Sequence, residues 1–304
     1  QIWLVSTNKR ASPTIVNGAT LEFDSIGNVD AGGIASALGA PRNAADGTIR
    51  LGAVDTSSNA QVTGTLRYIG SGTFSSDRNF ELIGAGGVID ASGAGFNSGR
   101  LLLSGDISAA TSGLKVLELN GNLRDTILSG AISDGMGTVE VKVDGPNTSL
   151  SLTGTNDYTG KTSIALGLLA VDTLADAGQA SSLGAPTGAN ATIELGSFAV
   201  GFGGLEYIGT GDSTNRAVQL TGNTNIDADG TGPVEFTAND FVVVSAGTLI
   251  LRGSNTDANT IHSNIPKPAA GNLSLNKSSS ATWVLRGDNT YGGKYVTNQS
   301  GGLL

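Results

Sequence analysis

Residues 150–160 read Leu-Ser-Leu-Thr-Gly-Thr-Asn-Asp-Tyr-Thr-Gly and lead into the run Gly-Leu-Leu-Ala-Val at 167–171. The leucines alternate with small polar residues, which is the pattern of a β-strand with one buried face. The Gly, Asn and Asp residues that follow are residue types that form tight turns. This stretch therefore predicts short strands joined by sharp corners.

The same motif occurs twice more in the chain. A close copy runs from Trp283 to Lys294 and is followed by Gly-Gly-Leu-Leu at 301–304, and a degenerate copy lies at 2–8 and 17–23. Because these residues recur together, we expect them to be structural. The set comprises Leu150, Leu152, Gly154, Asn156, Tyr158 and Gly160 in one copy and Trp283, Leu285, Gly287, Asn289 and Tyr291 in the other.

A longer repeat surrounds the motif. The block Ala-Ser-Ala-Leu-Gly-Ala-Pro at 35–41 returns as Ala-Ser-Ser-Leu-Gly-Ala-Pro at 180–186, and further matches follow downstream with an offset that falls from 145 to 137 residues. The repeats, each of about 140 residues, cover approximately 2–149 and 150–282, with the start of a third at 283–304. Both ends fall inside the motif, so we expect an excerpt from a longer array.

Short alternating runs separated by Gly, Asn, Asp and Ser continue through the whole chain, and no capped amphipathic helix is apparent. A sandwich or barrel and a parallel β-solenoid both fit such strands, and the long repeat favours the solenoid. We therefore predict an all-β chain in which residues 1–304 form a single continuous β-solenoid. Each coil should contain roughly 20–25 residues and lie about 4.8 Å from the next.

Composition limits the classes of function. The 304 residues include no cysteine, which excludes disulfides and thiolate metal sites, and a net charge of -9 argues against nucleic-acid partners. The longest apolar stretch, 164–171, is far too short to span a bilayer. One methionine and one histidine suit a protein that lives outside the cell, where oxidation and metal scavenging are hazards.

The motif at Leu150–Gly160, with its following Thr/Ile stretch and Gly-x-Leu, resembles the autotransporter-associated β-strand repeat of bacterial surface proteins. The Ala-Ser-x-Leu-Gly-Ala-Pro block is similar to the segment that usually follows that repeat. The resemblance implies a right-handed β-helical rod, secreted or on the bacterial cell surface, and it carries no active-site residues. The first copy departs from the pattern, with Ser6 in place of the Gly and 9–11 in place of the Tyr-containing stretch.

Catalytic candidates are few. His262 is the only imidazole and lies in a loop-like stretch before two prolines, so we predict a surface residue rather than a triad member. Asp90 and Asp227 occupy equivalent positions in the two repeats, and equivalent residues should lie several coils apart, too far to act together on one glycosidic bond. We expect these carboxylates to cap turns.

The repeated arginines Arg78 and Arg216 are expected to pair locally. Asp227 and Asp229 form an oxygen-rich cluster that is a candidate calcium site. They match neither the EF-hand loop nor the nonapeptide calcium repeat, so turn formation is the favoured interpretation. No cofactor is expected.

These observations favour a non-enzymatic structural or adhesive protein that forms a rigid rod, stalk or filament. The ends lack charged or proline-rich caps, so further repeats of the same chain or other copies of it are the expected partners of the terminal strands. Two alternatives stay open. One is a module that binds surface glycans through a lateral groove lined by Tyr, Asn and Asp. The other is a polysaccharide-degrading enzyme, for which 14% charged residues offer few candidates.

Overall fold

The computed structural model describes residues 2–93, 99–122, 126–198 and 201–297. The chain divides into two compact units, Gln1–Gly160 (unit 1) and Lys161–Leu304 (unit 2). Within the described residues nearly all regular structure is β-strand, and helical turns are confined to α1 (Ala44–Gly47) and η1 (Gly188–Ala191). The described part contains no helix with the length and hydrophobicity needed to cross a bilayer.

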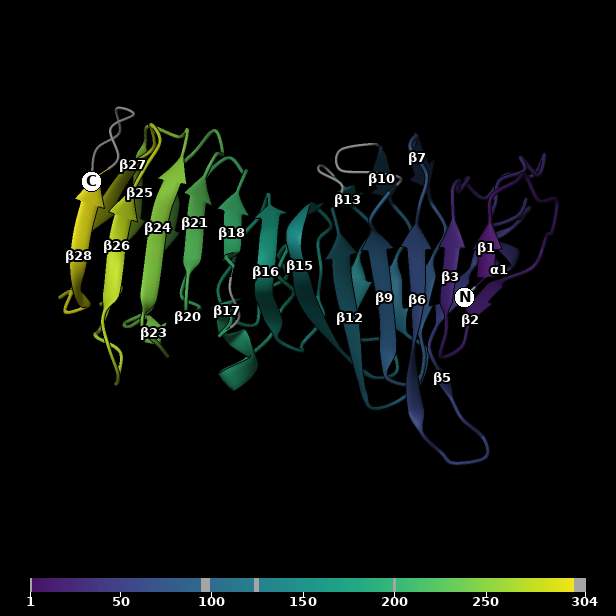
Figure 1. Cartoon of the computed structure of the whole chain (residues 1–304), viewed down its shortest axis with the longest axis horizontal. Coiled ribbons are helices and arrows are strands. Elements are labelled where there is room, and N and C mark those ends of the chain that lie inside the picture. The colour runs from purple at the N-terminus through teal and green to yellow at the C-terminus, as the bar shows by residue number, and fades with distance from the viewer. Residues whose placement is uncertain (1, 94–98, 123–125, 199–200, 298–304) are drawn as a thin grey trace. The chain divides into compact units, whose positions relative to one another are not determined.

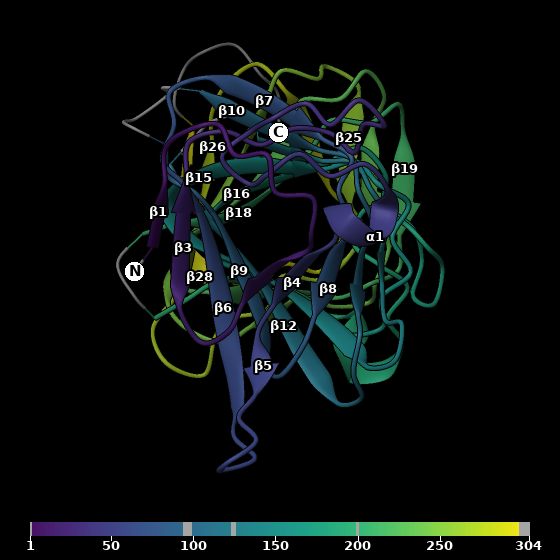
Figure 2. The same cartoon turned by 90° about the vertical axis from the view of Figure 1, so that its right-hand side faces the viewer.

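Unit 1 is a parallel β-solenoid whose coils carry strands on three sides (Figures 1 and 2). The first ladder contains β1 (Ile2–Leu4), β3 (Thr20–Phe23), β6 (Gln61–Tyr68), β9 (Gly86–Ala91), β12 (Leu114–Gly121) and the start of β15 (Thr138–Leu152). The second contains β7 (Thr73–Ser76), β10 (Arg100–Leu103), β13 (Thr126–Leu128) and the end of β15. The third contains β2 (Thr14–Val16), β4 (Ile49–Leu51), β8 (Phe80–Leu82), β11 (Ile107–Ala109) and β14 (Ile132–Ser133). A short antiparallel strand, β5 (Ala53–Val54), folds back on β6.

Unit 2 has the same plan. Its first ladder contains the end of β16 (Thr162–Val171), β18 (Gly203–Tyr207), β21 (Thr224–Ala228), β24 (Gly247–Gly253), β26 (Leu273–Lys277) and β28 (Gly292–Thr297). The second contains β19 (Asp212–Thr214), β22 (Val234–Phe236), β25 (Ala258–Ile261) and β27 (Thr282–Leu285). The third contains the start of β16, β17 (Ile193–Gly196), β20 (Val218–Thr221) and β23 (Val242–Val243).

Inward side chains stack in columns from coil to coil. Leu66 lies beside Ile89, 23 residues later, and both are almost fully buried. In unit 2, Leu205, Ile226 and Leu251 form a similar column. Each strand thus buries one face against the other sides of its own coil, which is the main source of stability in such a fold. The predicted parallel β-solenoid is confirmed, whereas its right-handed sense and its continuity across the two units stay predictions.

Two longer connections depart from this regular coil length. Leu21 pairs with Leu66, 45 residues later, because the Ala-Ser-x-Leu-Gly-Ala-Pro block leaves the coil as a lateral excursion. The block folds into a tight turn in which Leu38 is fully buried and Gly39 takes the left-handed conformation at φ +99°. The corresponding excursion of unit 2 buries Leu183 in the same way.

A buried arginine attaches each excursion to its coil. Arg78 is fully buried and donates hydrogen bonds to the carbonyls of Leu38 and Gly47 and to Thr14 Oγ1. Arg216 donates to the carbonyls of Leu183 and Ala191 at 2.9 and 2.7 Å. Burial lowers the pKa of Arg78 to about 10, so the guanidinium stays charged at neutral pH. The prediction that these arginines pair locally is wrong, because they bind backbone carbonyls, and for Arg78 also the Thr14 hydroxyl, 25 to 64 residues away in the sequence.

One corner of unit 1 is built from stacked glycines. A Cβ atom on Gly105 would lie 2.0 Å from the carbonyl oxygen of Arg78, and one on Gly130 would lie 2.1 Å from that of Gly105. A Cβ on Gly154 would lie 2.2 Å from the carbonyl oxygen of Gly130. The backbones approach so closely that only glycine fits, which explains the glycine at this point of the motif.

Replacing the buried arginine should destabilise unit 1 far more than replacing an exposed one. We expect Arg78→Met to lower the free energy of unfolding by about 3 kcal/mol or more, because it leaves buried carbonyls without donors. The exposed Arg42→Met is the matched control and should change it by no more than about 0.5 kcal/mol. Equilibrium urea denaturation measures the difference, and hydrogen exchange should locate the loss in β4 and β8. Equal urea midpoints for the two variants would contradict this role.

Candidate functional site

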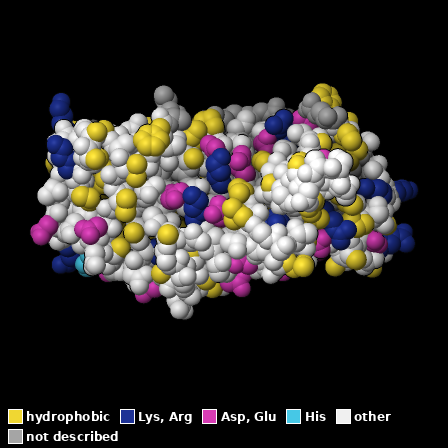
Figure 3. Space-filling view, turned by 90° about the horizontal axis from the view of Figure 1, so that it is seen from below, with side chains coloured by type: hydrophobic (Ala, Val, Ile, Leu, Met, Phe, Trp, Pro, Cys, Tyr) yellow, Lys and Arg dark blue, Asp and Glu magenta, His cyan; other side chains and the backbone are white. Residues whose placement is uncertain are grey.

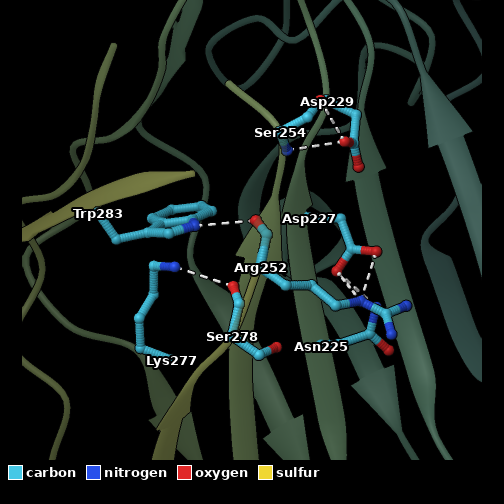
Figure 4. A network of polar contacts seen from close by, with 8 residues as sticks. All are labelled: Asn225, Asp227, Asp229, Arg252, Ser254, Lys277, Ser278 and Trp283. Atoms are coloured by element: carbon cyan, nitrogen blue, oxygen red, sulfur yellow. Dashed lines mark hydrogen bonds and ion pairs between the residues drawn. The ribbon is translucent and has the colours of Figure 1, made fainter. Parts of the chain in front are cut away.

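The motif residues lie in the interior and at the corners of the coils. Tyr158 and Trp283 are fully buried, and Leu150 and Leu152 belong to the core of unit 1. Trp283 donates through Nε1 to the carbonyl of Arg252 at 3.0 Å (Figure 4). Leu285 and Tyr291, in the last described coil of unit 2, are only partly buried.

The motif asparagines make the same contact in both copies. Asn156 Oδ1 accepts a hydrogen bond from the backbone N–H of Ile132 at 2.8 Å, one coil earlier. Asn289 Oδ1 accepts from the backbone N–H of Ile265 at 3.0 Å, and its amide donates to the carbonyl of Gly287. Gly160 and Gly287 each face a carbonyl oxygen of the preceding coil, from which a Cβ would lie only 2.2 Å away. In this structure the motif therefore links one coil to the next.

Charged residues also form a row across three neighbouring strands of unit 2. Glu206 on β18 lies in register with Asp227 on β21, which lies in register with Arg252 on β24. Arg252 Nε binds both carboxylate oxygens of Asp227, at 2.7 and 2.8 Å, and the Asn225 amide donates to Asp227 Oδ1 at 2.9 Å (Figure 4). We call Glu206, Asp227 and Arg252 the acidic row.

Unit 1 carries a row at the equivalent positions with the charges in a different order. Arg67 lies in register between Glu22 and Asp90 and binds both, at 3.2 and 2.6 Å. Ser92 adds a short hydrogen bond to Asp90. Glu206 of unit 2 stands where unit 1 has Arg67, so its neighbour Asp227 depends on Arg252 instead.

These contacts correct the expectation that Asp90 and Asp227 cap turns. Both lie inside strands, β9 and β21, and both are bound by an arginine of an adjacent strand. They are also almost completely buried, at 6% and 4% exposed. A buried carboxylate needs such a partner because desolvation strongly disfavours its charge. The two aspartates belong to different units.

The calcium candidates Asp227 and Asp229 have partners within the protein. Asp229 Oδ1 accepts from the backbone N–H and the hydroxyl of Ser254, at 2.8 and 2.7 Å (Figure 4). Both carboxylate oxygens of Asp227 already accept hydrogen bonds from Arg252 Nε. In the described part of the chain, no group of three or more acidic, histidine or cysteine side chains is arranged to hold a metal ion. Calcium binding stays a prediction without support from this geometry.

Glu206 has the most unusual environment in the acidic row. It is half-buried, and the pKa of its carboxyl is raised to about 7 by burial and by the nearby charges of Asp227 and Asp229. Burial also raises the pKa of Asp227, against the opposing effect of Arg252. The row can therefore take up a proton near neutral pH, which a lone surface glutamate does not do.

Sequence reasoning missed two buried lysines. Lys277 lies in the inward column of β26 and donates through Nζ to the carbonyls of Ser278 and Ser279, at 2.9 and 2.8 Å (Figure 4). Lys115 in unit 1 donates to the carbonyl of Ser112 at 2.6 Å. Burial lowers the pKa of both ammonium groups. The sequence did hold a sign of this burial for Lys277, because it continues the inward alternation of Leu273 and Leu275 along β26.

His262 is at the surface, as expected. Its ring Nε2 lies 3.2 Å from Glu235 Oε2, and its side chain is 39% exposed. On the face shown in Figure 3, lysines and arginines lie among aspartates and glutamates on a mostly uncharged surface. That face has no extended basic patch of the kind that binds nucleic acid.

The chain is similar to an autotransporter adhesin. Over 302 residues it is 34% identical to the adhesin BmaC autotransporter of Brucella suis biovar 1 (strain 1330), which covers 96% of this chain. The chain spans 8% of the length of that relative. Neither a protein-family model nor a solved structure matches the chain. Membership of the autotransporter-associated repeat family therefore stays a prediction.

The acidic row should make stability depend on pH. The pKa of Glu206 is about 7 in the folded chain against an ordinary value of 4.5. Between pH 4.5 and pH 7 the folded chain therefore keeps a proton that the unfolded chain has lost. The extra stability is complete below pH 4.5 and is lost as the pH rises through 7. Glu206→Gln should remove this dependence and raise the free energy of unfolding at pH 8 by about 1–2 kcal/mol, after allowance for solvent screening.

Thermal unfolding followed by circular dichroism from pH 5 to 8 provides the measurement. Glu194→Gln, on the neighbouring strand β17, is the control and should retain the decline of the wild-type chain. Parallel curves for the wild-type and Glu206→Gln chains would show that Glu206 titrates as an ordinary glutamate.

Proposed function

We propose that this chain is a segment of a bacterial surface protein with a structural and adhesive role rather than a catalytic one. The observation that carries the proposal is the similarity to an adhesin over nearly the whole chain. Support also comes from the charged residues that recur with the repeat. Arg78 and Asp227, for example, are occupied by contacts that hold coils together.

An extracellular or cell-surface location is part of the proposal, and the same comparison supports it because the relative is an autotransporter. The composition supports this location, since a chain without cysteine has no thiol to be oxidised outside the cell. The stacked coils supply the rigidity that such a role needs, because every strand within a ladder hydrogen-bonds to its neighbours.

We further propose that the outermost strands of the two units are covered by other β-solenoid coils, from the same chain or from another copy. On β1 of unit 1, Ile2 and Trp3 are 62% and 65% exposed. On β28 of unit 2, Tyr295 and Val296 are 45% and 42% exposed. An apolar strand with an open edge is a template for pairing with another strand.

Beads coated with the folded chain should adhere to cultured animal cells several-fold more than beads coated with the heat-unfolded chain, because adhesion requires the folded surface. Counting bound beads by microscopy measures the ratio. A ratio of one would contradict an adhesive role.

End-to-end pairing should depend on the outermost strands. In negative-stain electron microscopy over a concentration series, the chain should form particles that lengthen with concentration. Trp3→Lys combined with Tyr295→Lys should keep the particles single, because a charge on an edge strand opposes pairing. Met136→Lys is a control at an exposed position (71%) away from these strands and should behave like the wild-type chain. Wild-type particles of constant length at every concentration would contradict the assembly.

A further inference from the structure

A groove opens in unit 1 where the lateral excursion leaves the coil. It has a volume of about 510 Å³ and lies between β7 and the excursion segment 26–34. We call it the β7 groove. Its volume is within the range of about 300–1,000 Å³ that is usual for sites that bind small molecules.

The β7 groove contains a fixed aromatic ring. Phe74 is half-buried and packs edge-on against Tyr68, with ring centroids 6.1 Å apart and an interplanar angle of 67°. Tyr68 is itself held by a 2.7 Å hydrogen bond to the carbonyl of Gly72. The Phe74 ring lies over Gly72, where a Cβ would come within 2.8 Å of it. The opposite wall carries Ile34, which is 66% exposed.

Polar side chains line the same groove as Phe74 and keep hydrogen-bonding capacity. Asn28 Oδ1 accepts from the backbone N–H of Asp77 at 3.2 Å, and Asp77 Oδ1 accepts from the backbone N–H of Val29 at 2.7 Å. Among the described residues, the Asn28 amide nitrogen and Asp77 Oδ2 have no hydrogen-bond partner. Thr73 and Ser75 add exposed hydroxyl groups at the same rim.

We propose that the β7 groove binds a neutral saccharide of about disaccharide size. A sugar ring presents an apolar C–H face that packs on an aromatic ring, and its hydroxyls both donate and accept hydrogen bonds. The amide of Asn28 supplies a donor and the carboxylate of Asp77 an acceptor, next to the Phe74 ring. Asp30 and Asp77 line the groove on a chain with a net charge of -9, which opposes an anionic saccharide. The inference rests on the proposed adhesive function, for which it supplies a ligand class.

Unit 2 lacks both the aromatic ring of Phe74 and the amide of Asn28 at the equivalent positions. Asp212 stands where unit 1 has Phe74, and it accepts from the backbone N–H of Leu174 and from the Tyr207 hydroxyl, both at 3.0 Å. Asp176 stands where unit 1 has Asn28 and accepts the corresponding backbone N–H, from Asn215, at 2.7 Å. The same fold therefore tolerates an aspartate at either position, which supplies substitutions compatible with folding.

The test uses the full chain and four probes: lactose, cellobiose and chitobiose as neutral disaccharides, and 3′-sialyllactose as an anionic saccharide. Saturation-transfer NMR should detect at least one neutral disaccharide with a millimolar Kd, as expected for a shallow open site. Binding of 3′-sialyllactose should be at least tenfold weaker. Phe74→Asp and Asn28→Asp should each weaken binding at least tenfold, with unchanged circular dichroism. Asp176→Asn, the reverse exchange in unit 2, should leave binding unchanged.

The inference is wrong if no neutral disaccharide binds, if both unit 1 variants bind as the wild-type chain does, or if 3′-sialyllactose binds best. It is also wrong if an extended peptide, such as an oligo-Ser/Thr peptide added as competitor, displaces the sugar by pairing with β7 and binds more tightly. The bead assay separates the two proposals. Bead adhesion by a chain that binds none of the neutral disaccharides overturns the saccharide inference alone. Disaccharide binding without bead adhesion overturns the adhesive function alone.

Discussion

Backbone hydrogen bonding between successive coils is the constraint on which the rest of each unit depends. Every strand in a ladder must match the outline of the strand before and after it, so a position that is close-packed in one coil is close-packed in the next. The column of Gly105, Gly130 and Gly154 is the clearest case, because each backbone approaches the carbonyl of the previous coil too closely for any side chain. The side chains of the motif asparagines also connect successive coils, since Asn156 and Asn289 each accept a hydrogen bond from a backbone N–H one coil earlier.

The lateral excursions are the exception to this uniformity, and a buried guanidinium makes each of them possible. Arg78 and Arg216 supply charged donors to carbonyls that would otherwise lie in the interior without partners. This contact fixes where the excursion leaves the coil and where it returns. The β7 groove lies between the first part of the excursion and β7.

The sequence was sufficient to predict an all-β chain and the parallel solenoid, because alternation and turn residues are local signals. It was insufficient where a side chain acts over a long distance. The partners of Arg78 are two backbone carbonyls and the Thr14 hydroxyl, 31 to 64 residues away, and nothing local indicates them. Lys115 and Lys277 are buried and donate to backbone carbonyls, which was not predicted from the sequence. The groove around Phe74 depends on the path of the excursion, which no residue pattern specifies.

The different order of charges in the two rows also has a consequence for how a chain of near-identical repeats folds. Unit 1 places Arg67 between Glu22 and Asp90, whereas unit 2 places Glu206 at the corresponding point. If a strand from one repeat stacked into the other during synthesis, Glu206 would stand between Glu22 and Asp90, and three carboxylates would adjoin without a cation. Repulsion between these carboxylates would disfavour such a mispaired intermediate relative to the native stacking.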